Sequence, residues 1–364
     1  MNGSNSPDDS AVASKDPRLR LPETCEPPGE GNPHKPAVWM IFGATGHMGR
    51  AVFRTVLSHG DRVTAVGWKD EHTIEQMQSW QEPPNSIGAL CDIRIRGTVD
   101  SVIQKSIEHW GHIDVIAICT GNGVIGACED QDDHDLRNQF ETNFWGTLHI
   151  IQSSLPYFRN RTPEPGGRYL IFSSTSGALG VPGLGPYCAT KYAVEGLIES
   201  MLYEVDTFNI KATLVEPGHV RLDEEDRKDL EKGGLKVYSL FRIKAASEPY
   251  SGPTAPASHA KRMVQWMNDR QPTSAARSAE LVWQLAHCSY PPLRLILGTY
   301  AVESIRDRLR SIIEEIEDWK HLSFPQTEEE ARAQEELEKK ERERVEEAER
   351  EQEEEDRLMD GVAE

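Results

Sequence analysis

A tyrosine and a lysine four residues apart, Tyr187 and Lys191, are the strongest candidates for proton chemistry in this sequence. Residues at this spacing share one face of a helix, so both side chains can point into one cleft. A free phenol has a pKa of ~10 and is a poor acid or base near neutrality, but a neighbouring ammonium favours the phenolate. Ser174, thirteen residues before the tyrosine, ends an apolar segment and is suited to hold a substrate oxygen by a hydrogen bond.

A glycine turn, Gly43-Ala-Thr-Gly-His-Met-Gly49, follows the first apolar run of the chain. Glycines let the backbone approach a pyrophosphate, and the positive end of the following helix favours its charge. The turn residues that we expect to contact a dinucleotide are Gly43, Thr45, Gly46, His47, Met48 and Gly49.

Each motif has an ordinary explanation when it stands alone. The turn could simply connect a strand to a helix, and Tyr187 and Lys191 could be a packed aromatic and a solvated charge. Their occurrence in this order, with Ser174 at this offset, favours binding of a nicotinamide dinucleotide and transfer of a hydride.

Composition divides the 364 residues into three parts. Residues 1–35 are polar and rich in Pro, Gly, Ser and Asp, which predicts disorder. Residues 36–325 are predicted to form a single domain. Residues 326–364 hold 18 acidic and 7 basic side chains, which predicts an exposed, partly helical tail without the apolar seam of a coiled coil. The net charge of −20 argues against binding to nucleic acid or to an anionic membrane surface.

The cysteines and histidines suggest no bound metal. None of the six cysteines forms a Cys-x-x-Cys pair, and no apolar leader precedes them, so we expect reduced thiols and a cytoplasmic protein. His109 and His112 lack a third ligand at suitable spacing, and a turn explains them better than a metal site. No apolar run approaches the ~20 residues needed to cross a bilayer.

Apolar runs and helical spacing alternate along the chain. The predicted helices cover 50–59, 99–110, 133–158, a segment that begins near Tyr187, and 278–287. The predicted strands cover 37–42, 62–66, 87–91, 114–119, 168–172, 210–215 and 293–297. This alternation predicts an α/β fold with a doubly wound parallel sheet of the Rossmann type.

The order of these motifs resembles the short-chain dehydrogenase/reductase family over roughly residues 36–320. It consists of a glycine turn, an acid after the third strand, an Asn in a long helix, a Ser, Tyr-x-x-x-Lys and Pro-Gly. The segment 291–298 is similar to uncharacterised fungal and bacterial NAD(P)-binding reductases. The resemblance implies a catalytic tetrad of Asn143, Ser174, Tyr187 and Lys191.

The same resemblance assigns further roles. Asp92 would contact the adenine ring, although an ordinary loop acid is the alternative. Asn143 would bend its helix and hold a water in a proton relay, and Lys191 would also bind the nicotinamide ribose. Tyr187 would act as general acid/base between the cofactor and a carbonyl or secondary alcohol, in a homodimer or tetramer. The remaining residues implied to bind the cofactor are Thr120, Gly121, Pro217, Gly218 and Val220.

Three positions depart from the family pattern. Phe42 and His47 replace the first Thr and the middle Gly of the usual turn, and the resulting spacing looks like that of longer-chain members. The Asn-Asn-Ala-Gly after the fourth strand is Ile-Cys-Thr-Gly, ending at Gly121. Leu222 stands where a Thr often follows Pro-Gly.

The end of the second strand favours NADP over NAD, which stays possible. NAD enzymes of this shape place an acid there to bind the ribose 2′-hydroxyl, but the chain reads Gly67-Trp-Lys69 and has no acid until Asp70. Lys69, together with Arg50, could meet a 2′-phosphate, or Lys69 could be a solvated surface charge. The rival functions are a non-catalytic NAD(P)-binding regulator and an epimerase or dehydratase. Residues 219–275 and the loop after Ser174 are expected to select the substrate.

Overall fold

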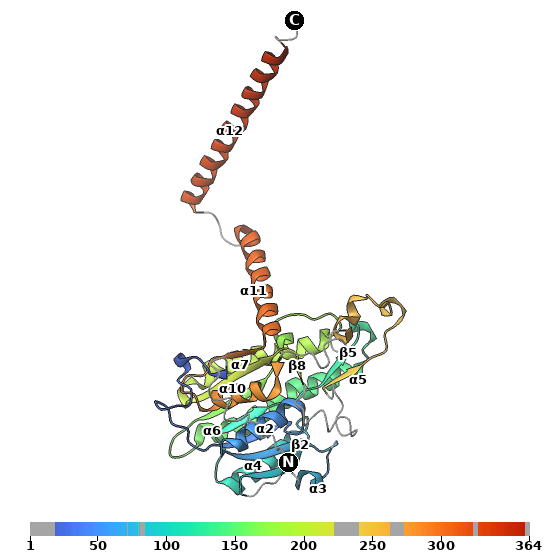
Figure 1. The fold of residues 1–364 in the computed structure, drawn as a ribbon, viewed down its shortest axis with the longest axis vertical. Helices are drawn as coiled ribbons and strands as arrows, with labels where there is room; N and C mark the ends of the chain where they lie inside the picture. Colours follow the sequence, from blue (N-terminus) through green and yellow to red (C-terminus); the bar gives the residue numbers. More distant parts are fainter. Residues whose placement is uncertain are drawn as a thin grey trace, which may run out of the picture. The chain divides into compact units, whose positions relative to one another are not determined.

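The structure is a computed structural model that describes residues 19–70, 72–78, 80, 84–221, 240–262, 273–322 and 327–360. The chain divides into two compact units, Met1–Arg306 and Asp307–Glu364, a boundary earlier than the predicted one at residue 325. The first unit holds the α/β fold (Figure 1). In the described part of the second unit, the chain is helical in the later part of α11 (Thr299–Trp319) and in α12 (Glu328–Asp360). No described helix is both long and apolar enough to span a bilayer.

Seven parallel strands form the central sheet in the order β11-β7-β6-β4-β1-β2-β3, as the alternating pattern predicts. Their bounds are β1 Val38–Phe42, β2 Arg62–Trp68, β3 Ser86–Cys91, β4 Val115–Ile118, β6 Gly167–Phe172, β7 Ile210–Pro217 and β11 Arg294–Leu297. Every residue of β1 is buried, because helices cover both faces of the sheet. The strand order reverses between β1 and β4, and a crevice forms at their carboxyl ends in folds of this type.

Two groups of helices make the two outer layers (Figure 1). Trp39 and Ile41 of β1 pack with α2 (His47–Ser58) and α10 (Ala275–His287) on one face. Met40 and Phe42 point to the other face. The helices on that face are α4 (Arg96–Trp110), α6 (Gly146–Asn160) and α7 (Gly185–Val205).

The predicted long helix over 133–158 has three parts. α5 (Asp133–Phe140) runs into a π-helical turn, Glu141–Trp145, and then into α6. Asn143 lies within the π turn, so the irregularity expected at this residue is present. Such turns insert an extra residue and often mark functional sites.

Several short elements were not predicted. β5 (Gly123–Ile125) pairs with β9 (Phe241–Ile243), and β8 (Val220–Arg221) pairs with β10 (Thr273–Ser274). α3 spans Ile74–Gln78. The 3-10 helices are Glu23–Cys25, Cys128–Asp130, Thr175–Gly177, Asp206–Phe208, Glu248–Tyr250, Pro256–Ser258 and Lys320–Leu322.

The N-terminal segment differs from the prediction of disorder over 1–35, which is wrong for residues 19–35. Leu19 and Leu21 are buried, and the Gln284 side chain on α10 bonds the backbone of both. Apolar burial and hydrogen-bonded backbone groups therefore order this segment, although its composition alone predicts disorder. Residues 1–18 lie outside the described residues, as does Leu222.

Asp61 anchors the same segment from the start of β2. Its carboxylate is fully buried and accepts five hydrogen bonds. The donors are ring nitrogens of His34 and His287, the indole nitrogens of Trp39 and Trp283, and the Ala37 amide. Burial raises the pKa of Asp61, but the hydrogen bonds, led by that from His287, lower it to about 2.

Candidate active site

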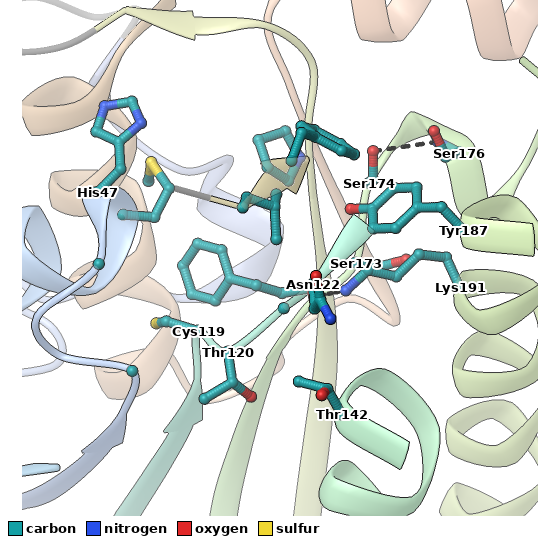
Figure 2. Close-up of a pocket in the computed structure, with 18 of the residues that line it drawn as sticks. His47, Cys119, Thr120, Asn122, Thr142, Ser173, Ser174, Ser176, Tyr187 and Lys191 are labelled. Carbon is teal, nitrogen blue, oxygen red and sulfur yellow. Dashed lines mark hydrogen bonds between the residues drawn. The ribbon is translucent and has the colours of Figure 1, made fainter. Parts of the chain in front are cut away.

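A cavity of about 540 Å³ opens at the carboxyl edge of the sheet (Figure 2). It is lined by the glycine turn after β1, by the ends of β2, β3, β4 and β6, and by the segment that follows β7. Figure 2 shows His47 on the side of the glycine turn and Tyr187 and Lys191 on the side of α7. The cavity therefore lies where the fold predicts a dinucleotide and a substrate to meet.

Tyr187 and Lys191 project from α7 into this cavity, as their spacing predicts. The Ser174 side chain follows β6 and lines the same cavity beside Tyr187 (Figure 2). Ser174 Oγ also accepts from the Ser176 amide at 3.2 Å, which fixes its direction (Figure 2). Lys191 Nζ lies 5.7 Å from the centroid of the Tyr187 ring and donates to the Phe172 carbonyl at 2.9 Å.

Burial sets the ionisation of both helical groups. Burial raises the pKa of Tyr187, and the neighbouring Ser174 hydroxyl acts against this rise. The expectation that the lysine brings the phenol toward neutrality is therefore opposed by desolvation, the stronger effect here. Burial lowers the pKa of Lys191 to about 8, against the charges of Glu195 and Cys119.

Asn143 lies behind the cavity rather than in its wall. Its Oδ1 accepts from the Asn122 amide at 2.8 Å, and its Nδ2 donates to the Asn122 carbonyl at 2.7 Å. The same Nδ2 donates to Thr190 Oγ1 at 2.9 Å. The π turn thus lets one side chain join the end of β4 to α7, next to Tyr187 and Lys191.

Two positions of the glycine turn have room only for glycine. Gly43 has φ +76°, and a Cβ there would lie 3.0 Å from the Cys119 carbonyl carbon and the Thr120 nitrogen. A Cβ at Gly49 would lie 2.0 Å from the Gly43 oxygen. The backbone of the turn is therefore free of side chains where it approaches the end of β4.

The residues present fit a dinucleotide. Thr120 Oγ1 is buried in the cavity wall and has no hydrogen-bond partner among the described residues, so it can bond a ligand. His47 bonds the Arg221 carbonyl at 3.0 Å, which joins the glycine turn to β8 on the far side of the groove. A glycine cradle, a helix N-terminus and an unused donor together match the needs of a pyrophosphate and a ribose.

Arg94, which no sequence motif singled out, organises the end of the cavity next to β2 and β3. Its Nε and Nη2 bond both oxygens of Asp92 at 2.9 and 2.8 Å, and this pairing lowers the pKa of Asp92. The guanidinium also lies 5.3 Å from the Trp68 ring centroid and 3.3 Å from Asp70. Lys69 Nζ lies 3.7 Å from Asp92, with 41% of its side chain exposed. The place of Arg94 two residues after Asp92 was the available signal.

The cavity brings together most of the predicted site residues. Those in its wall are Gly43, Thr45, Gly46, His47, Met48, Asp92, Thr120, Gly121, Ser174, Tyr187, Lys191, Pro217, Gly218 and Val220. Gly49, Lys69 and Asn143 lie outside the wall, each next to a residue that forms it. The wall also contains residues that no sequence motif singled out, namely Asn122, Arg94, His219, His259, Leu240 and Phe241.

The wall near Tyr187 is apolar. The Phe241 ring of β9 meets the Tyr187 ring edge-on at 5.0 Å, and Val181, Leu184 and Leu240 line the same region. His219 is a polar residue of the cavity wall: its ring lies against Tyr300, and burial together with the charge of His259 lowers its pKa.

Comparison with known proteins identifies the class. A family model for short chain dehydrogenases matches residues 37–232, more than half of the chain. The chain therefore belongs to the short-chain dehydrogenase family, and the predicted family and the predicted enzyme class, an NAD(P)-dependent dehydrogenase/reductase, are confirmed.

Individual relatives and a solved structure support the same family. Oxidoreductase BOA17 of Botryotinia fuckeliana is 28% identical over 286 residues, which cover 79% of this chain and 97% of that protein. Uncharacterized oxidoreductase C162.03 of Schizosaccharomyces pombe is 27% identical over 282 residues, 76% of this chain and 87% of that protein. The crystal structure of a short-chain dehydrogenase from Streptomyces avermitilis is similar with a TM-score of 0.68 at 26% identity, covering 79% of this chain and 98% of that one.

Proposed function

We propose that this enzyme transfers a hydride between NADP(H) and a carbonyl or secondary alcohol, with Tyr187 as the general acid/base. The observation that carries the proposal is that Ser174, Tyr187 and Lys191 line one cavity together with the glycine turn. A regulator that only binds the cofactor would have no use for this arrangement. An epimerase or dehydratase remains a rival that product analysis separates.

Ser174, Tyr187 and Lys191 have different roles in proton transfer. In reduction, Ser174 donates a hydrogen bond to the substrate oxygen and holds it beside the Tyr187 hydroxyl. Tyr187 then gives its proton to the developing alkoxide, and in oxidation it removes that proton. A bound nicotinamide supplies or accepts the hydride. The protonated Lys191 favours the phenolate that Tyr187 becomes in reduction and would also bind the ribose hydroxyls of the cofactor.

Asn143 would support this relay from behind. The Asn143 side-chain amide already bonds the Asn122 backbone and Thr190. A water in the proton relay would therefore bond the Asn143 backbone rather than its side chain. Asn143 keeps α7 and the end of β4 in fixed relation.

Two cations support a preference for NADP. Lys69 and Arg94 both stand at the ends of β2 and β3, where an adenosine 2′-phosphate would lie. Asp70 is already engaged by Arg94, at 3.3 Å, so it is a poor partner for a free 2′-hydroxyl.

The apolar wall formed by Val181, Leu184, Leu240 and Phe241 supports a substrate whose carbon skeleton is hydrophobic.

Exposed aromatic side chains on the π turn and α7, namely Trp145, Tyr192 and Tyr203, support assembly as a homodimer or tetramer. Light scattering at micromolar concentration measures that mass.

A direct test follows reduced nicotinamide by its absorbance while aliphatic and aromatic ketones are supplied. Consumption of NADPH with formation of the matching alcohol supports the proposal. Product formation without net consumption of the cofactor would instead indicate an epimerase or dehydratase, and cofactor binding without any product would indicate a regulator.

A further inference from the structure

Glu195 is a buried acid that the reaction proposed above does not use. It lies on α7 one turn beyond Lys191 and is 4% exposed. A carboxylate is costly to bury unless it is hydrogen-bonded and paired, so its partners indicate its role.

The carboxylate supports the segment that carries Ser174. Ser173 Oγ donates to Glu195 Oε1 at 2.6 Å, and Ser173 directly precedes Ser174 in the chain. A Cβ built on Gly177 would lie 1.9 Å from the same oxygen, so Glu195 also rests against the end of the 3-10 turn. Both ends of the segment 173–177 therefore contact one carboxylate.

The same carboxylate acts on Lys191 by its charge. Burial lowers the pKa of Lys191 to about 8, and the negative charge of Glu195 raises it. The other groups that face the ammonium are Cys119 at the end of β4, the Phe172 carbonyl of β6 and the Tyr187 ring on α7. Glu195 is the acid among them with the largest effect.

Arg294 on β11 holds Glu195 from the far side. Its Nη2 lies 3.4 Å from Glu195 Oε2 and 3.2 Å from Glu199, and its Nε lies 3.1 Å from the buried Glu216. Burial raises the pKa of Glu195, whereas Ser173, Arg294 and Lys191 lower it. Burial and the charge of Glu195 raise the pKa of Glu216 to about 7. The acid is thus fixed between a cation on one side and the active site on the other.

We propose that Glu195 is a positioning residue of the active site, which holds the Ser174 segment and the Lys191 ammonium in place. The kinetic part of the proposal rests on the proposed function. Cofactor affinity as a function of pH tests the charge on Lys191 without any turnover, so a failure of the proposed reaction leaves the proposal testable.

The experiment compares Glu195→Gln with two other variants of the full chain, Ser173→Ala and Glu199→Gln. NADPH affinity is measured by fluorescence across pH 6–10, and kcat is measured with a ketone. In Glu195→Gln we expect the alkaline loss of affinity to move about one pH unit lower, because Lys191 loses a counter-charge, and kcat to fall ~10-fold. Ser173→Ala should lower kcat without moving the pH midpoint of NADPH affinity, because it removes the hydrogen bond to Glu195 and keeps the charge of Glu195.

Glu199→Gln is the matched control, since Glu199 shares Arg294 but contacts neither Ser173 nor Gly177 among the described residues. It should leave both measurements unchanged. A wild-type midpoint and kcat in folded Glu195→Gln would overturn the proposal, and so would equal shifts in Glu199→Gln. If Glu195→Gln does not fold, Glu195→Asp keeps the charge but shortens the reach. Glu195→Asp should keep the wild-type pH midpoint of NADPH affinity and have a lower kcat. A wild-type kcat in both Glu195→Asp and Ser173→Ala would refute the positioning of the Ser174 segment by Glu195.

Discussion

The Lys191 ammonium donates a hydrogen bond to the Phe172 carbonyl at 2.9 Å, and so joins α7 to the last residue of β6. Ser173 and Ser174 follow Phe172 directly, so this bond sets the distance between the helix with Tyr187 and the segment with Ser174. The geometry of the proposed acid/base pair thus depends on a backbone acceptor as well as on helix spacing. The Lys191 side chain is buried, and this burial lowers its pKa.

Tyr187→Phe should abolish turnover while cofactor binding persists. The phenol hydroxyl is the group placed to transfer the proton, a contribution of about 10²–10⁴-fold. The ring itself stays available to pack against Phe241. Rates with a ketone substrate and NADPH titrations on the same preparation check this. Substantial activity in the variant would contradict the proposed mechanism.

Cofactor affinity should decline as pH rises through about 8, where the buried Lys191 loses its proton. The sign follows from the lowered pKa: the ammonium is present below that value and absent above it. Lys191→Ala should remove most of this pH dependence and weaken both affinity and kcat. Calorimetry from pH 6 to pH 10 provides the measurement, and an unchanged affinity in Lys191→Ala would rule out contact with the ribose.

NADPH should bind more tightly than NADH, because Lys69 and Arg94 are both placed to meet a 2′-phosphate. Lys69→Ala and Arg94→Ala should each weaken NADPH relative to NADH by about tenfold, which corresponds to about 1.4 kcal/mol. Arg96→Ala is a suitable control, since Arg96 is exposed and bonds Gln152 outside the cavity wall. Equal dissociation constants for the two cofactors in the wild-type enzyme would defeat the prediction.

The main sheet and most of the site could be predicted from the sequence because their signals are local. Buried parallel strands appear as continuous apolar runs such as 38–42, and Tyr187 and Lys191 are linked by helix spacing alone. The glycine turn is equally local, since the close approach at Gly43 permits no side chain.

The features that were missed depend on contacts between distant residues. β9 has three residues and exists only because it pairs with β5, so Phe241 gives no pattern of its own. The Leu21 amide donates a hydrogen bond to the Gln284 side chain, 263 positions away in the chain. Arg94 was overlooked because its role comes from Trp68 at the end of β2 and from Asp70 just after it. Composition and periodicity do not report such pairings.

Asp61→Asn should destabilise the fold by about 3 kcal/mol, because five donors would face a side chain with one acceptor. The folded pKa of about 2 lies below the ordinary 3.8, so the contribution is present above pH 3.8 and is lost as pH falls toward 2. Urea unfolding of the wild type and variant at pH 7 and near pH 3 measures both effects. Glu280→Gln, which alters the neighbouring pair with His59, is the control. Equal stability of Asp61→Asn and wild type at pH 7 would disprove the anchoring role.

Removal of the tail after residue 325 should leave turnover and melting temperature unchanged. The described side chains of α12 are exposed almost without exception up to Val345, and the helix is instead supported by pairs such as Glu338–Arg342 one turn apart. Its larger apolar residues Leu337 and Val345 are 68% and 54% exposed, too few and too far apart for a coiled-coil seam. Circular dichroism of the full and shortened chains should show a loss of helix signal, and thermal melts with kcat measurements should coincide. A fall of several degrees in Tm, or a loss of kcat, would show that the tail belongs to the folded enzyme, whereas loss of a binding partner with intact kcat would assign it a docking role.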